Sequence, residues 1–203
     1  MSQRAAFLSC EGVLAEDASR VSRPQEFHWL PGAVQALKWL QRAEWKLVVV
    51  TNQPGIARGL VGPAEYDNLT DWMRAELSAH GVTLAGIYHC PHLPDTPLAA
   101  WRRQCECHLP KPGLLRRAAR DLSLDLPSCV MLGHRADDIL AGRAARLAAC
   151  VRILGDDTPA VTEVPTEKAL PTDTQAWPET DYTCSTLAEG AYWLLAHERE
   201  RRA

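Results

Sequence analysis

The chain has 203 residues, of which 46% are hydrophobic and 23% are charged, and its formal net charge is -3. This composition is typical of a soluble α/β domain with its own core, and the weakly acidic balance argues against a nucleic-acid partner. No apolar stretch approaches the roughly 18 residues of a membrane span, and the start of the chain does not resemble a signal peptide. We therefore expect a cytoplasmic protein without a membrane partner.

Short apolar runs alternate with longer amphipathic runs along the first half of the chain. Apolar residues at helical spacing predict helices, whereas short β-branched runs predict buried strands. In chain order, the sequence predicts a strand at 6–8, a helix that opens after Gly32, a strand at 46–50, a helix around 69–77 that ends near Gly81, and a strand at 87–89.

The same alternation continues in the second half. It predicts a helix at 112–122, a strand at 129–132, an Ala-rich helix at 136–149 and a strand at 151–154. Residues 155–182, rich in Pro, Thr, Asp and Glu, predict an irregular segment, and a capping-box pattern at 186–189 precedes a final helix at 185–201. Strict alternation predicts an α/β fold with a parallel sheet covered by helices on both faces, in one domain over 1–203 with a core at about 5–154.

Polar residues follow several of the predicted strands directly. Residues 9–11 (Ser-Cys-Glu) follow the first strand, Thr51 and Asn52 follow the second, and His134 and Arg135 follow the strand at 129–132. Ligands of open parallel sheets bind outside the carboxyl ends of the strands. We therefore expect these segments to meet at one site.

Four residues form a metal-binding pattern in the middle of the chain. Cys90 and His92 are followed, after twelve intervening residues, by Cys105 and Cys107. Three thiolates and one imidazole suit a tetrahedral zinc ion and leave no open coordination position, which is typical of a structural site. The alternative, four unliganded core residues, fits poorly with so polar a segment.

Three segments together resemble a known family. Residues 48–59, VVVTNQPGIARG, resemble the VVTNQSGIARG segment of D-glycero-D-manno-heptose-1,7-bisphosphate 7-phosphatases and of the related histidinol phosphatases. Residues 88–92 and 105–107 match the zinc loop of that family, and 110–113 match the proline-rich stretch after it. The resemblance implies a haloacid-dehalogenase (HAD) fold with a Rossmann-like core and a minimal cap. It also implies removal of a sugar phosphate by an aspartyl nucleophile with magnesium.

The residues that correspond to the family's catalytic motifs differ. The first motif, DxDGT or DxDGV in the family, reads SCEGV at 9–13, so Ser9 stands at the nucleophile position and Glu11 at the acid/base position. The last motif, GDKxxD, reads GHRADD at 133–138, so His134 stands at the position of a magnesium ligand. The resemblance therefore implies a catalytic set that is not intact.

The phosphate-binding positions are better preserved. The resemblance assigns Thr51, Asn52, His108 and Arg135 to phosphate or substrate binding, although the family's Arg-Lys pair after the zinc loop here reads His108 and Leu109. Leu109 thus replaces a cation that would face the transferring phosphoryl group.

These replacements affect the chemistry strongly. A carboxylate nucleophile is ionised at neutral pH, whereas the Ser9 hydroxyl needs an adjacent base. Magnesium prefers hard oxygen ligands, so Ser9 and His134 are poor substitutes and Asp138 alone would hold it weakly, which makes magnesium a doubtful cofactor. Each lost electrostatic partner costs roughly 3 to 4 kcal/mol in the transition state, by analogy with single oxyanion-hole donors.

Other interpretations of single residues remain open. Ser9 and His134 could form a new nucleophile–base pair, but no third orienting group is evident. Cys10 could be a reactive thiol, although its position after the first strand favours a core side chain. The seven tryptophans could form a stacking surface, but their spread along the chain favours packing.

Two classes of function follow. In the first, the chain is a zinc-stabilised pseudophosphatase that binds a phosphate ligand or a protein partner. In the second, it is a weak or unconventional phosphatase of a phosphorylated sugar of the D,D-heptose 1,7-bisphosphate type. The altered motifs at 9–13 and 133–138 favour the first, and the preserved Thr51-Asn52 segment keeps the second open.

Overall fold

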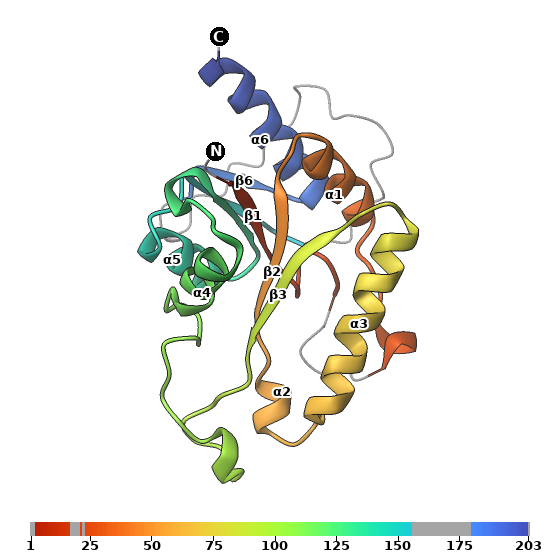
Figure 1. Cartoon of the computed structure of the whole chain (residues 1–203), viewed down its shortest axis with the longest axis vertical. Helices are drawn as coiled ribbons and strands as arrows, with labels where there is room; N and C mark the ends of the chain where they lie inside the picture. The colour runs from red at the N-terminus through yellow and green to blue at the C-terminus, as the bar shows by residue number, and fades with distance from the viewer. Residues whose placement is uncertain (1–2, 17–20, 22, 156–179, 203) are drawn as a thin grey trace.

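The computed structural model describes residues 3–16, 21, 23–155 and 180–202, and its centre is a single parallel sheet (Figure 1). The sheet has six strands in the order β3-β2-β1-β4-β5-β6. The strands are β1 (Ala5–Ser9), β2 (Lys46–Asn52), β3 (Leu84–Cys90), β4 (Val130–Gly133), β5 (Ala149–Ile153) and β6 (Tyr182–Cys184). All five pairings are parallel, as the alternation of strand and helix predicts.

Helices cover both faces of this sheet. They are α1 (Ala33–Arg42), α2 (Pro54–Ala57), α3 (Pro63–Ala79), α4 (Gly113–Leu122), α5 (Ala136–Ala144) and α6 (Leu187–Arg202). Short 3-10 turns lie at Pro24–Glu26, Ala99–Trp101 and Leu126–Ser128. None of the described helices is long and apolar enough to cross a membrane. The predicted α/β fold with helices on both faces is confirmed.

Two apolar cores follow from the period of two along β1. Ala6 and Leu8 face one core, which α1, α3 and α6 complete, whereas Ala5 and Phe7 face the other, beneath α4 and α5. Buried on both faces, the strand has no polar side chain before Ser9, where it ends. Its first polar groups therefore appear at the carboxyl edge of the sheet.

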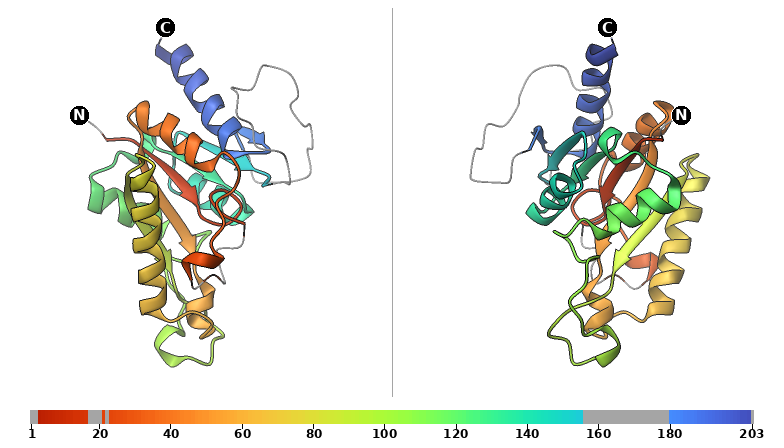
Figure 2. Two further views of the ribbon diagram at one scale, coloured as in Figure 1. Left: turned by 90° about the vertical axis from the view of Figure 1, so that its right-hand side faces the viewer. Right: turned by 60° about the vertical axis from the view of Figure 1, so that its left-hand side comes forward.

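Different elements lie at the two ends of the molecule. Figure 2 shows α1 and α6 side by side at the end where α6 runs out past the sheet, and the loop between β3 and α4 at the opposite end. One half of the predicted capping box is present, because the Thr186 hydroxyl accepts from the Glu189 amide at 3.2 Å. The Glu189 carboxylate instead accepts from the Ser185 amide, one residue before Thr186, at 2.9 Å.

Several predicted boundaries were wrong. The Ala-rich helix ends at Ala144 and not at Ala149, because Arg146 takes a left-handed conformation (φ 58°) that reverses the chain before β5 begins at Ala149. The short elements α2 and β6 were not predicted, since four and three residues carry too little periodicity.

Of the segment predicted to be irregular, residues 156–179 lie outside the described part of the chain. The single domain over 1–203 stays a prediction.

Candidate functional site

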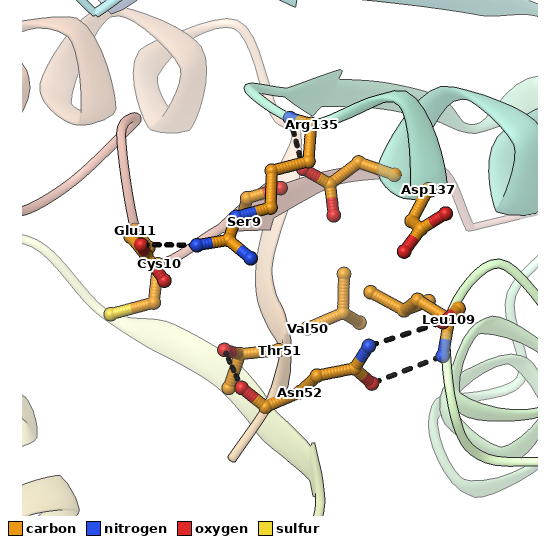
Figure 3. Close-up of a pocket in the computed structure, with 10 residues that line it drawn as sticks. Ser9, Cys10, Glu11, Val50, Thr51, Asn52, Leu109, Arg135 and Asp137 are labelled. Carbon is orange, nitrogen blue, oxygen red and sulfur yellow. Dashed lines mark hydrogen bonds and ion pairs between the residues drawn. The ribbon is translucent and has the colours of Figure 1, made fainter. Parts of the chain in front are cut away.

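The carboxyl ends of β1, β2 and β4 meet at one pocket, as their polar residues predict (Figure 3). The residues that line it are Ser9, Cys10, Glu11, Val50, Thr51, Asn52, Leu109, Arg135, Asp137 and Asp138. The strand ends lie close together because Leu8 pairs with both Val49 and Leu132, and this register brings the three strands to the same level.

Ser9 lies deep in this pocket. The residue is only 4% exposed, and its hydroxyl lies near the Asp138 carboxylate without a hydrogen bond of regular geometry. The next residue, Cys10, is 3% exposed and belongs to the apolar core, as predicted. Burial raises the pKa of the Cys10 thiol to about 12, so this thiol stays protonated at neutral pH.

The Asp138 side chain caps the N-terminus of α5. Its Oδ2 accepts hydrogen bonds from the backbone amides of His134 at 3.0 Å and Arg135 at 2.9 Å, which satisfies two donors at the helix N-terminus. Burial raises the pKa of Asp138, and the nearby Ser9 hydroxyl and these two amides partly oppose the rise. The carboxylate is thus already in use as a helix cap.

Glu11 and Arg135 form an ion pair between the β1 and β4 ends of the pocket. Figure 3 shows the Arg135 side chain reaching over the pocket toward Glu11, with Thr51 and Asn52 on the far side. Thr51 is 8% exposed, and its hydroxyl donates to the backbone carbonyl of Asn52 at 3.2 Å.

His134 follows β4 but does not line the pocket. Its Nδ1 lies 3.0 Å from the carbonyl oxygen of Ile153, where it donates a hydrogen bond. Its ring packs on Gly12, so closely that a Cβ on Gly12 would lie 2.2 Å from the His134 Cγ. The structure therefore does not bring His134 and Ser9 together at the pocket as a nucleophile and its base.

The predicted metal residues converge in the loop after β3. One ligand atom from each of Cys90, His92, Cys105 and Cys107 lies within 4.8 Å of the others. The Cys107 sulfur lies 3.2 Å from both the Cys90 and Cys105 sulfurs and 3.3 Å from His92 Nδ1, and none of these cysteines is in a disulfide. Three sulfurs and one imidazole nitrogen at these separations fit a tetrahedral zinc ion.

His108 lies beside this cluster. Its Nδ1 is 3.6 Å from the Cys90 sulfur, and the residue is absent from the lining of the pocket. The next residue, Leu109, does line the pocket, through a backbone that is hydrogen-bonded to Asn52. A substrate-binding role for His108 therefore stays a prediction without support from its position.

Comparison with known proteins identifies the relatives of this chain. Residues 107–189 match the model of the HAD-hydrolase-like family. The chain is 36% identical over 149 residues to a D-glycero-beta-D-manno-heptose-1,7-bisphosphate 7-phosphatase of Photorhabdus laumondii, an alignment that covers 73% of this chain and 79% of the relative. A protein of the same name from Vibrio cholerae is 37% identical over 145 residues, which covers 71% and 78%.

The chain belongs to the D-glycero-D-manno-heptose-1,7-bisphosphate 7-phosphatase family. The solved structures agree with this assignment. The D,D-heptose 1,7-bisphosphate phosphatase from B. bronchiseptica, complexed with magnesium and phosphate, superposes with a TM-score of 0.76 and 29% identity, covering 96% of this chain and 99% of that one. The predicted family is confirmed, and these relatives favour the phosphatase interpretation over the non-catalytic one.

Sequence reasoning missed several features of the site within this family. Asp137 lines the pocket, the Leu109 backbone holds Asn52, and the His134 ring packs on Gly12. Asp137 lies in the first turn of α5, and its proximity to the motif could have predicted its place in the pocket. The other two depend on contacts between residues 57 and 122 positions apart, which no local pattern carries.

Proposed function

We propose that the chain binds the phosphate group of a phosphorylated sugar in the pocket between β1, β2 and β4, and that it does not hydrolyse this group through an aspartyl-phosphate intermediate. One observation carries the proposal: a buried serine, Ser9, is the residue at the end of β1, where the family places its nucleophilic aspartate.

Phosphate binding is supported by the donors that remain. Arg135 presents a guanidinium at the pocket, and its planar fork matches the oxygens of a phosphate. Thr51 and Asn52 lie opposite at the end of β2, where the backbone turns into α2. The Arg135 guanidinium suits an anion whether or not a covalent step follows, whereas the Thr51 hydroxyl and the Asn52 side chain already donate to backbone carbonyls.

The serine route lacks a dedicated base, such as a histidine, among the described residues of the pocket. A serine hydroxyl becomes a useful nucleophile only when a neighbouring group takes its proton. Asp138 lies beside the Ser9 hydroxyl, but its Oδ2 caps α5, and Glu11 pairs with Arg135. The His134 ring is turned to the Ile153 carbonyl. The carboxylates near Ser9 thus serve other contacts.

The residues at the family's magnesium position do not fit that ion. Magnesium binds carboxylate and carbonyl oxygens in octahedral geometry. Ser9 offers a hydroxyl in place of a carboxylate, His134 points its ring away, and one oxygen of Asp138 already accepts two amide hydrogens. We therefore derive no catalytic step through magnesium in this chain.

The Cys/His cluster supports a structural zinc ion in the same proposal. Zinc would be held by Cys90, His92, Cys105 and Cys107, and it would fasten the two ends of a loop that contributes few residues to the apolar cores. The chemistry that it supplies there is a cross-link, because four protein ligands leave no position for substrate.

A weak phosphatase of a phosphorylated sugar is the second candidate. Its support is the family membership itself, since the relatives carry the names of heptose bisphosphate phosphatases. The carboxylates of Asp137 and Asp138 also line the pocket beside the phosphate-binding residues. This candidate predicts slow release of phosphate that follows the concentration of the protein.

Calorimetric titration with inorganic phosphate tests the binding proposal. We expect saturable binding by the purified full chain, with the same affinity in the presence and absence of magnesium. Arg135→Gln should weaken it about tenfold, which corresponds to about 1.4 kcal/mol for a lost charge-assisted contact. Binding that appears only when magnesium is added would contradict the proposal and favour the second candidate.

A further inference from the structure

The ion pair between Glu11 and Arg135 joins two strand-end segments that are 124 positions apart in the sequence. The Arg135 side chain is 60% exposed and the Glu11 side chain is 24% exposed, so a dissolved anion can reach the guanidinium. Among the described residues that line this pocket, Arg135 is the only lysine or arginine. The one cation that the described part of the chain brings to the pocket is therefore held by a carboxylate of the chain itself.

Both side chains are longer than their counterparts in the family motifs. Glu11 has one methylene more than the aspartate of DxDGV, and Arg135 reaches further than the lysine of GDKxxD. A guanidinium binds carboxylates and phosphates with the same fork of N–H donors. The extra reach on each side allows a carboxylate to occupy a donor that a phosphate would use.

The backbones that carry this pair are fixed by other contacts. The Arg135 amide donates to Asp138 at 2.9 Å, and the Gly12 amide donates to the Ala15 carbonyl at 2.8 Å. The His134 ring packs on Gly12 and so holds the two segments together. An incoming anion thus needs only side-chain movement to separate Glu11 from Arg135.

Building on the proposed phosphate-binding function, we propose that Glu11 is an internal competitor of the anionic ligand and sets how tightly the pocket binds a phosphate group. The carboxylates of Asp137 and Asp138 line the same pocket. A phosphate dianion therefore gains the guanidinium nitrogen that contacts Glu11 only when it displaces that carboxylate. Ligand affinity in this chain is limited by that exchange.

Calorimetric titration of inorganic phosphate into the full chain tests this inference. Glu11→Gln keeps the shape of the side chain and removes its charge, and we expect about fivefold tighter binding, the equivalent of one partly exposed ion pair. Glu76→Gln is the matched control, because it also removes an exposed contact, between Glu76 on α3 and the C-cap residue His80, away from the pocket. It should leave the affinity unchanged.

Two further variants complete the test. Glu11→Gln combined with Arg135→Gln should lose the whole gain in phosphate affinity. Glu11→Asp draws the carboxylate back by one methylene and should show the same gain in affinity, so it replaces Glu11→Gln if that variant folds poorly. Measurable binding with equal affinity in the wild type and the Glu11 variants would overturn the inference and leave the proposed function standing. Failure of all variants to bind phosphate would overturn both.

Discussion

The side chain of Asn52 and the backbone of Leu109 exchange two hydrogen bonds: Nδ2 donates to the Leu109 carbonyl at 3.1 Å, and the Leu109 amide donates to Oδ1 at 3.0 Å (Figure 3). Leu109 comes two residues after Cys107 of the metal cluster. The Cys90 carbonyl, at the other side of the cluster, accepts from the Gln53 amide at 2.8 Å. Both segments of the Cys/His cluster are thus tied to the end of β2, which lines the pocket.

The purified protein should contain about one zinc ion per chain, because closed thiolate sites bind zinc tightly. Cys105→Ser should lower the zinc content, the melting temperature and the affinity for phosphate together, since the metal positions the segment that holds Asn52. Elemental analysis, thermal unfolding and calorimetry measure the three quantities. Glu106→Gln, between two of the ligands, is the control and should retain zinc. A zinc-free protein as isolated would rule out the metal assignment.

Asn52→Ala should destabilise the fold by about 1 to 3 kcal/mol, because the Leu109 amide loses its partner in a place where Leu109 is only 2% exposed. It should also weaken phosphate binding. Chemical denaturation measures the first effect and calorimetry the second. Asn68→Ala on the exposed side of α3 provides the comparison and should change neither quantity. Equal unfolding free energies for the two variants would show that the Asn52–Leu109 pair contributes nothing.

Gly12→Ala should be strongly destabilising. Gly12 has a φ of 71°, and an added Cβ would lie 2.2 Å from the His134 ring. Gly81 has a similar φ of 77° with nothing within 4 Å of an added Cβ, so Gly81→Ala isolates the backbone cost of about 1 kcal/mol. We expect Gly12→Ala to cost at least about 2 kcal/mol more in denaturant unfolding. Similar values for both variants would mean that the His134 ring moves away freely.

The burial of Asp138 predicts a pH dependence of stability. Because burial raises its pKa in the folded protein, the folded state keeps this proton to a higher pH than the unfolded chain does. The contribution of Asp138 to the free energy of unfolding is therefore largest below its ordinary pKa of about 4 and falls as the pH rises through the folded value. Relative to Asp138→Asn, the wild type should lose stability as the pH rises from about 4 toward 7. Asp137→Asn is the exposed control. A wild type that becomes more stable relative to Asp138→Asn as the pH rises over this range would contradict the raised pKa of Asp138.

The sequence predicted those parts of the site that depend on local patterns and sheet geometry. The strand ends at Ser9, Asn52 and Gly133 could be expected to meet because parallel strands bring their carboxyl ends to one edge. The metal cluster could be expected because its ligand spacing is itself the signal.

The directions of side chains at this edge could not be predicted. His134 turns to the Ile153 carbonyl and packs on Gly12, so its orientation depends on two segments far away in the sequence. His108 lies toward Cys90 although its motif position suggested the substrate. The three residues of β6 have no periodic pattern of their own, and they form a strand only through pairing with β5.

Restoring the family's residues should restore its chemistry. Ser9→Asp, Glu11→Asp, Leu109→Lys and His134→Asp in one protein should give measurable, magnesium-dependent release of phosphate, whereas no single substitution should do so, because nucleophile and metal act as a unit. Steady-state assays on D,D-heptose 1,7-bisphosphate compare the five proteins. Activity in the Ser9→Asp variant alone would show that the other three positions are not limiting.

The most direct measurement is the release of phosphate from D,D-heptose 1,7-bisphosphate by the unmodified chain in magnesium buffer. We predict a rate no higher than that of buffer alone, because Ser9 cannot form an aspartyl phosphate and Asp138, the carboxylate beside it, caps α5. Turnover that rises with protein concentration and disappears in Ser9→Ala would contradict the account and assign the reaction to the serine hydroxyl.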